Sequence, residues 1–385
     1  MVMDNPFKFG GIVRGPYFAD RTEELDELTR EMENLSRVFL VSPRRYGKTC
    51  LLFNLMDTLD EIGLSSAYID LNACPDIKSF AETFTHTASK GLETNTDKLI
   101  KMLSGLHRLR PKVSVGHDGS LTAGVEVVVQ EKDGIAALIE GMNHAETLAG
   151  KKNRKLVVII DEFSDLIKFN GRHLEKALRS EIQQHEHIGY IFSGSEESVM
   201  LSMVKDRKRA FYKLGRIMNL GPISQDAYSD FIVNWLQKGG YTANRQDLHK
   251  IFELGQNIPH NIQRLCNILW EIARDDRVIT PAMIDTLPVI IAQQDSPHYE
   301  LLWRSASQQQ KKLLIALSRT PGLKPFSKEF QLTHGIGPSS SIKASLDSLV
   351  KKGILLRTLE GPYQFSDIFM TNWIEYIMDP RGHVI

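Results

Sequence analysis

The sequence carries no excess of charge of either sign: 47 Lys and Arg residues balance 47 Asp and Glu residues. The whole molecule therefore has no net electrostatic attraction to nucleic acid, and only a local basic surface could argue for such a partner. Because 42% of the residues are hydrophobic and 24% are charged, the composition is that of an ordinary globular protein and excludes the disordered class.

Long apolar runs and cysteine motifs are missing as well. Residues 1–9 contain no signal core, and no later run approaches the roughly 18 apolar residues of a membrane span. We therefore expect a cytoplasmic protein with no membrane partner. Cys50, Cys74 and Cys266 have neither metal-ligand spacing nor even pairing, which favours reduced thiols that serve in packing.

With 385 residues, the chain is long enough for two or three domains. In residues 1–221, apolar runs at 38–41, 66–71, 156–160 and 190–193 alternate with helical stretches, which predicts a parallel sheet covered by helices. Alternation around an Asp-Gly turn at 111–130 predicts an inserted β-hairpin. Residues 222–295 have helical periodicity and are interpreted as a small lid domain, and residues 296–385 as a winged-helix domain.

The strongest local signal is the run SPRRYGKT at 42–49, which follows the first predicted strand and precedes a helical run at 51–59. Such a strand-to-helix turn directs backbone N–H groups and a helix N-terminus at phosphate oxygens, as in a P-loop. Lys48 would then reach the β- and γ-phosphates of ATP, and the Thr49 hydroxyl would bind Mg²⁺. Ser42 replaces the first glycine of the usual pattern, so a turn with a chance Gly-Lys-Thr remains the alternative. The predicted nucleotide-binding residues are Ser42, Pro43, Arg44, Arg45, Tyr46, Gly47, Lys48, Thr49 and Cys50.

A second motif supports the first. Five apolar residues at 156–160 end in Asp161 and Glu162, and a buried parallel strand would bring both carboxylates to the same sheet edge as the P-loop. Asp161 is suited to hold Mg²⁺ through water, and Glu162 to act as general base on the attacking water. An acidic pair at a helix N-terminus is the alternative for these residues alone, but the partner motif argues against it. The predicted fold class is α/β, a P-loop NTPase parallel sheet with a helical lid and a C-terminal winged-helix domain.

With these motifs the whole chain resembles the archaeal-type and bacterial AAA-like ATPases, which are related to signal-transduction ATPases with numerous domains and, more distantly, to archaeal origin-recognition initiators. The runs NPF at 5–7 and GPYFADR at 15–21 resemble a segment that lies beside the adenine in relatives, which implies nucleotide contacts by Phe18 and Arg21. Asp20 and Glu23 also fit a capping box, so a simple helix start accounts for part of this pattern.

The resemblance extends further along the chain. The run IFSGS at 191–195 stands where relatives have a sensor strand, which implies that Ser195, or alternatively Ser193, detects the γ-phosphate. A strand end of small residues explains either serine equally well. The run YKLGR at 212–216 resembles the family's Gly-Arg segment, which implies that Arg216 stabilises the transferred phosphoryl group in its own subunit or a neighbour's. This arginine lies in a basic run, and most arginines in such runs are solvated. The predicted catalytic residues are Glu162, Lys48, Ser195 and Arg216.

In the lid, the run GQNIPHNIQR at 255–264 resembles the turn and helix that relatives place over the nucleotide. The resemblance implies that Pro259 packs on the base and that His260 or Arg264 detects the phosphates. A proline in the first turn of a helix also has a purely structural role.

The C-terminal segment predicts helices at 308–318, 327–333 and 339–352 and a wing at 354–365. From residue 301 onwards, eleven Lys and Arg residues stand against six Asp and Glu residues, a net charge of +5.

A winged helix can place its third helix in the major groove of duplex DNA. This helix lacks the arginine cluster that would make base reading persuasive, and winged helices also bind proteins. Duplex DNA and a protein partner or second copy of the chain both remain open as partners. The residues that would face DNA are Ser339, Ser340, Ser341 and Lys343.

The predicted function is Mg-dependent binding and hydrolysis of ATP to ADP and phosphate, driving a conformational change that the winged helix could couple to DNA. The alternative is a slow or non-hydrolysing ATP-dependent switch or scaffold that binds a protein partner. The carboxylate pair favours hydrolysis, whereas the altered P-loop glycine keeps the alternative open.

Overall fold

The computed structural model of the protein describes residues 3–93, 95–115, 121–128, 133–169, 171–320, 324–357 and 363–378. The chain forms two compact units. We call Lys8–Ser224 with Ile258–His260 the sheet unit, and Met1–Phe7, Gln225–Asn257 and Asn261–Ile385 the helical unit. None of the described helices is long and apolar enough to cross a bilayer.

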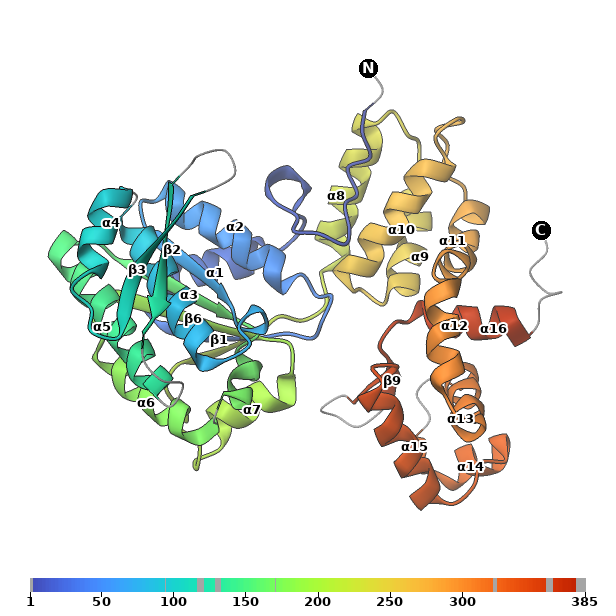
Figure 1. Ribbon diagram of the computed structural model, residues 1–385. Helices are drawn as coiled ribbons and strands as arrows, with labels where there is room; N and C mark the ends of the chain where they lie inside the picture. The colour runs from blue at the N-terminus through green and yellow to red at the C-terminus, as the bar shows by residue number, and fades with distance from the viewer. Residues whose placement is uncertain are drawn as a thin grey trace. The chain divides into compact units, whose positions relative to one another are not determined.

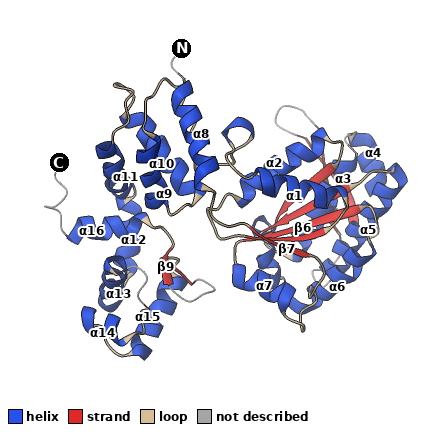
Figure 2. Ribbon diagram, turned by 180° about the vertical axis from the view of Figure 1, so that it is seen from behind, coloured by secondary structure: helices blue, strands red, loops and turns tan. Residues whose placement is uncertain are grey.

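The sheet unit is built on five parallel strands in the order β2-β5-β6-β1-β7. Figures 1 and 2 show this sheet, which is drawn in red in Figure 2. The four predicted strands are confirmed to within two residues at each end. The fifth strand was not predicted, because it is a short edge strand in which Met218 is buried while its two end residues are exposed. The strands are β1 (Arg37–Val41), β2 (Ser65–Asp70), β5 (Leu156–Asp161), β6 (Ile188–Gly194) and β7 (Arg216–Asn219).

Helices cover both faces of this sheet (Figure 1). β5 is buried along its whole length, as expected of a central parallel strand, and its side chains alternate between two cores. Val157 and Ile159 pack with α1 (Thr22–Glu33) and α2 (Lys48–Glu61). The remaining apolar residues of β5 face the opposite core. That core is covered by α3 (Ile77–Leu92), α5 (Gly134–Lys152), α6 (Gly171–Gln184) and α7 (Glu197–Lys205).

Between α3 and α5 the chain makes an insertion in the region predicted as a hairpin. Its two strands are antiparallel, with Leu109 opposite Val127 and Val115 opposite Leu121. The predicted Asp-Gly turn at 117–120 lies outside the described residues. The elements here are α4 (Thr96–Leu103), β3 (Leu109–Val115) and β4 (Leu121–Val127), and the short 3-10 helices of the sheet unit are η1 (Gly15–Tyr17), η2 (Leu71–Ala73) and η4 (Phe163–Lys168).

The helical unit contains the lid helices and then the predicted winged helix. The winged helix is confirmed: three helices are followed by an antiparallel pair of strands, in which Leu355 lies opposite Phe365. A capping box between Ser307 and Gln310 starts its first helix. The elements are α8 (Gln225–Lys238), α9 (Arg245–Gly255), α10 (Pro259–Ile272), α11 (Pro281–Gln294), α12 (Ser296–Ser305), α13 (Gln308–Arg319), α14 (Lys328–His334), α15 (Ser339–Lys351), β8 (Leu355–Arg357), β9 (Tyr363–Phe365) and α16 (Phe369–Met378).

The domain boundaries predicted at 221/222 and 295/296 remain predictions. Along the chain, the sheet unit gives way to the helical unit at Ser224/Gln225, and Ile258–His260, which includes the first two residues of α10, belongs to the sheet unit by its contacts.

Candidate functional site

The loop between β1 and α2 carries the P-loop sequence. Its first residue, Ser42, is fully buried, and its N–H donates to the carbonyl of Gly194 at 3.3 Å. Positive φ angles occur at Arg45 (74°) and Gly47 (85°) but not at Ser42. The serine that replaces the usual glycine therefore needs no left-handed backbone, because the tight turn is made farther along the loop.

α2 begins at Lys48, directly after the N-cap residue Gly47. Glycine has no side chain that could bond the first turn, and among the described residues no atom outside the adjoining backbone and neighbouring residues lies within 4 Å of the position that a Cβ would take at Gly47. The first N–H groups of a helix lack partners within the helix and carry the positive end of its dipole. An open loop at such a terminus is an arrangement that binds phosphate oxygens.

The Asp161 carboxylate, at the end of β5, is the centre of a hydrogen-bond network. Oδ1 forms an ion pair with the Lys48 ammonium group and accepts the N–H of Glu162 at 2.9 Å. Oδ2 accepts the Thr49 hydroxyl at 3.3 Å and the Tyr68 hydroxyl at 2.9 Å. Lys48 and Asp161 are 113 residues apart in the sequence and have side chains only 6% and 4% exposed. The structure thus brings the two predicted motifs together at one sheet edge.

Opposing effects act on the pKa of Asp161. Burial alone would raise it, but the Lys48 ammonium, assisted by the hydroxyl of Tyr68, outweighs burial and holds the pKa below its usual value. For Tyr68, burial and then the charge of Asp161 raise the pKa, so the phenol keeps its proton and can act as donor. The site therefore holds Asp161 as a carboxylate surrounded by donors.

Glu162 is the more accessible of the two acidic residues, with its side chain 29% exposed. Oε1 lies 3.3 Å from Nζ of Lys48, and Oε2 accepts the hydroxyl of Ser195 at 2.8 Å and its N–H at 3.3 Å. The backbone of Glu162 has a positive φ of 49°, which is uncommon for glutamate and recurs at functional sites. Of the two serines considered from the sequence, Ser195 contacts Glu162, whereas Ser193 is fully buried in β6.

The predicted capping box at the start of α1 is wrong. The N-cap residue is Arg21, without a side-chain cap, and Asp20 instead accepts the N–H of Ser224 at 3.1 Å. Arg21 is 5% exposed, and its guanidinium donates to the carbonyls of Gly221 at 2.6 Å and Tyr46 at 3.5 Å. It thereby supports the P-loop through its backbone.

The segment before α1 is held against α2. Asn54 donates to the carbonyl of Val13 and accepts the N–H of Gly15, both at 2.9 Å. The Cys50 sulfur accepts the N–H of Val13 at 3.3 Å. Farther along, Phe18 is half-buried on the α1–α2 core. This segment therefore lies beside the helix that begins at the P-loop.

The lid residues predicted to contact nucleotide separate into two groups. Pro259 opens α10, and the N–H of His260 donates to the carbonyl of Arg45 in the P-loop at 3.3 Å. Arg264, by contrast, forms two hydrogen bonds with Asp295, at 2.6 and 2.9 Å, within the helical unit. Its ion pair connects α10 to the junction of α11 and α12, so Arg264 has a structural role here.

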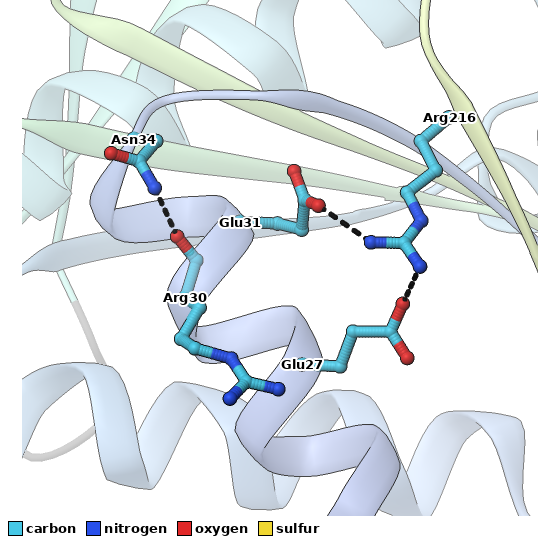
Figure 3. A pocket seen from close by; sticks show the side chains of 5 residues that line it. All are labelled: Glu27, Arg30, Glu31, Asn34 and Arg216. Atoms are coloured by element: carbon cyan, nitrogen blue, oxygen red, sulfur yellow. Dashed lines mark hydrogen bonds and ion pairs between the residues drawn. The ribbon is translucent and has the colours of Figure 1, made fainter.

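Arg216 is not brought to this network. It begins β7 and pairs with Val38, whereas the P-loop leaves β1 after Val41, three residues farther along the parallel strand. Its guanidinium forms ion pairs with Glu27 and with Glu31 (2.8 Å) on α1 (Figure 3). These contacts lie at the amino end of β7, whereas the P-loop follows the carboxyl end of β1. A surface pocket of about 430 Å³ is lined there by Glu27, Arg30, Glu31, Asn34 and Arg216.

Sequence reasoning missed Tyr68 and Asn54. Tyr68 belongs to no motif, and its contact with Asp161 depends on the pairing of β2 with β5, which the sequence alone does not reveal. A signal for Asn54 was available, since a buried amide on the apolar face of a helix needs hydrogen-bond partners outside that helix.

Comparison with known proteins identifies the family and the fold of the chain. The family profile described as an ATPase domain predominantly from Archaea matches residues 18–265, and one described as "Probable winged helix domain" matches residues 297–376. Among solved structures, the chain is similar to the Walker-type ATPase PABY2304 of Pyrococcus abyssi, with a TM-score of 0.63, 15% identity and coverage of 96% of this chain and 99% of that one.

A second similar structure is the ORC2 protein of Aeropyrum pernix in its ADPNP–ADP complexes, with a TM-score of 0.54, 13% identity and coverage of 99% of both chains. No curated protein sequence matches the chain. At these identities the similar structures establish the fold alone. Because the first profile spans well over half of the chain, the protein belongs to the family of ATPase domains found predominantly in Archaea.

Proposed function

We propose that the protein binds ATP with Mg²⁺ at the carboxyl edge of the sheet and hydrolyses it to ADP and phosphate. One observation carries the proposal: the P-loop and the acidic motif meet in a single network that joins Lys48 and Thr49 to Asp161 and Glu162. Family membership supports nucleotide chemistry, and the network supplies the residues for it.

Phosphate binding is assigned to the P-loop. The α2 N-terminus and the loop N–H groups bind the phosphate oxygens, and the Lys48 ammonium turns from Asp161 to the β- and γ-phosphates. Resemblance to relatives supports base contacts by Phe18, Pro259 and His260. Arg21 supports the nucleotide indirectly, because its guanidinium is bonded to the carbonyl of Tyr46.

Asp161 and Thr49 would hold the metal ion. Carboxylate and hydroxyl oxygens suit Mg²⁺, and Asp161 already orders donors on both of its oxygens. Among the described residues, no three His, Cys, Asp or Glu side chains gather into a metal site. This agrees with an ion held mainly by nucleotide phosphates and one or two protein groups, and such an ion neutralises charge on the transferred phosphoryl group.

Glu162 is assigned as the general base. It orients a water toward the γ-phosphorus and accepts its proton as the bond from the γ-phosphorus to the β-phosphate oxygen breaks, which releases ADP and phosphate. The 2.8 Å hydrogen bond from Ser195 sets the direction of the carboxylate. Arg216 would assist only in a neighbouring subunit, since in its own subunit the side chain is engaged at the amino end of β7, away from the P-loop.

We further propose that the nucleotide state is coupled to the winged helix and that duplex DNA is its ligand. On α15, Ser339, Ser340 and Lys343 are exposed and Ser341 is half-buried, and the hydroxyls of Ser339 and Ser341 accept hydrogen bonds from Gln331 and Gln309. With Lys343 as the one cation among these four residues, the face is weakly basic, which fits phosphate contacts better than base reading. A protein partner or second copy is the competing ligand of this domain.

The first experiment is steady-state phosphate release with Mg-ATP, with and without duplex DNA, beside Lys48→Ala and Glu162→Gln. We expect turnover to disappear with Lys48→Ala, and Glu162→Gln to bind ATP while turning over roughly 10²–10⁴-fold more slowly. Stimulation by DNA supports the coupling. Tight ATP binding with negligible wild-type turnover would instead favour an ATP-dependent switch that binds a protein partner.

A further inference from the structure

Tyr68, on β2, forms a hydrogen bond with the acidic motif but belongs to neither of the two sequence motifs of the site. Its hydroxyl donates to Oδ2 of Asp161 at 2.9 Å, the same oxygen that accepts the Thr49 hydroxyl at 3.3 Å. The two hydroxyls therefore converge on one carboxylate oxygen from different elements, one from the strand beside β5 and one from the first turn of α2.

The position of the Tyr68 ring is determined by its surroundings. β2 and β5 are paired in parallel, with Tyr68 opposite Ile159 and Asp70 opposite Asp161. On the α2 side, the ring lies against that of Phe53, with centroids 4.7 Å apart. The Arg14 guanidinium covers the Phe53 ring at 4.6 Å and forms a 2.9 Å ion pair with Asp57 of the same helix. Ring and hydroxyl are thus both held.

We propose that Tyr68 is a positioning residue that holds Asp161 in the orientation required for the divalent metal ion, together with Thr49. This inference rests on the proposed function and names a residue that neither motif contains. Carboxylates that bind metals are themselves oriented by hydrogen bonds, and removing such a partner typically lowers metal affinity by roughly 10–100-fold. Oδ1 is oriented by Lys48 and the N–H of Glu162, and Oδ2 by the hydroxyls of Thr49 and Tyr68. Because Thr49 is itself assigned to the metal ion, Tyr68 is the donor to Oδ2 that is not expected to contact nucleotide or metal.

Tyr68→Phe is the discriminating variant, because it keeps the ring against Phe53 and removes only the hydroxyl. We expect the affinity of the ADP-bound protein for Mn²⁺, measured by electron paramagnetic resonance of the free ion, to fall roughly tenfold or more. Binding of a fluorescent ATP analogue in EDTA should stay within about twofold of wild type, because the P-loop is untouched. In turnover assays, the Mg²⁺ concentration for half-maximal rate should rise by the same factor as the Mn²⁺ dissociation constant.

Tyr190→Phe is the matched control, since it removes another buried tyrosine hydroxyl, bonded to His185 at the opposite end of β6. It should change neither metal nor nucleotide binding. If Tyr68→Phe binds Mn²⁺ as wild type does, Tyr68 serves in packing alone and the inference is overturned. Tyr68→Leu, which also removes the ring, would then alter only thermal stability. If the wild-type protein with ADP binds no Mn²⁺ at all, the proposed metal site itself fails.

Discussion

The Ser195 hydroxyl donates a 2.8 Å hydrogen bond to Oε2 of Glu162, while the other carboxylate oxygen lies 3.3 Å from the Lys48 ammonium. Glu162 is therefore held from two sides at the end of β5. Since the general base that we propose must be aimed at the water it activates, we expect catalysis to depend on Ser195 more than on Ser193.

Ser195→Ala should reduce kcat roughly tenfold or more, because a hydrogen bond to a charged group contributes about 1.5–3 kcal/mol and would be lost from the general base. KM for ATP should change little, since Ser195 contacts the carboxylate rather than the phosphate-binding loop. Ser195→Thr keeps a hydroxyl and should recover much of the rate. A raised KM with unchanged kcat would show instead that Ser195 binds the nucleotide directly.

Two positions of the P-loop should respond differently when glycine is introduced or removed. Ser42→Gly restores the usual pattern but should not tighten ATP binding, because Ser42 has no positive φ; it should destabilise the fold by about 0.5–1 kcal/mol through added backbone freedom. Gly47→Ala forces alanine to φ 85°, at a cost of about 1–2 kcal/mol, and should weaken ATP binding. Denaturation and nucleotide titration measure both. A gain in affinity from Ser42→Gly would contradict this view of the loop.

Much of the sheet could be predicted because β1, β5 and β6 are buried on both faces and read as apolar runs. The edge strand β7 could not, since burial of Met218 between exposed ends leaves no such run. Without β7, the sequence also could not show that Arg216 begins an edge strand, three residues before the level at which the P-loop leaves β1. The order of the strands is a tertiary property, and the contact of Tyr68 with Asp161 depends on it.

The centre of the candidate site was predictable for a physical reason. Each motif ends a parallel strand, and parallel strands present their carboxyl ends at one edge, so Lys48 and Asp161 had to lie close together. The choice between Ser193 and Ser195 needed coordinates, because it depends on which residue leaves the strand and reaches Glu162.

Arg216 should be dispensable for turnover in the dilute protein. Its guanidinium is engaged by Glu27 and Glu31 at the amino end of β7, away from its own P-loop. We expect Arg216→Ala to stay within about twofold of wild type at low protein concentration, since removing a distant exposed charge has little effect on a buried site. A loss confined to high protein concentration would support action in a neighbouring subunit.

The control for Arg216 is a mixture with Lys48→Ala protein, whose arginine is intact. If Arg216 acts between subunits, adding this inactive protein should restore rate to concentrated Arg216→Ala. A concentration-independent tenfold loss in Arg216→Ala would mean that the arginine reaches its own nucleotide after a rearrangement, contrary to the expectation.

His185 should make the fold sensitive to acid. It is 4% exposed, and its Nδ1 lies 2.6 Å from the Tyr190 hydroxyl, which can donate to the neutral ring. Burial, with a contribution from Arg37, lowers its pKa from 6.5 to about 4, although the nearby Glu146 carboxylate opposes the shift. The folded protein therefore binds fewer protons here than the unfolded chain does between those two values.

Because the unfolded chain gains the proton first, stability should fall as the pH drops from about 6.5 to about 4, by up to about 3 kcal/mol, and stay level above that range. Burial lowers the pKa of His86 and His144 as well, so the test is the difference between wild type and His185→Gln in urea denaturation at several pH values. The advantage of wild type at pH 7.5 should shrink or reverse by pH 5. His249→Gln, at an exposed position, controls for the loss of an imidazole. An advantage that grows in acid would mean that His185 is charged in the fold, paired with Glu146.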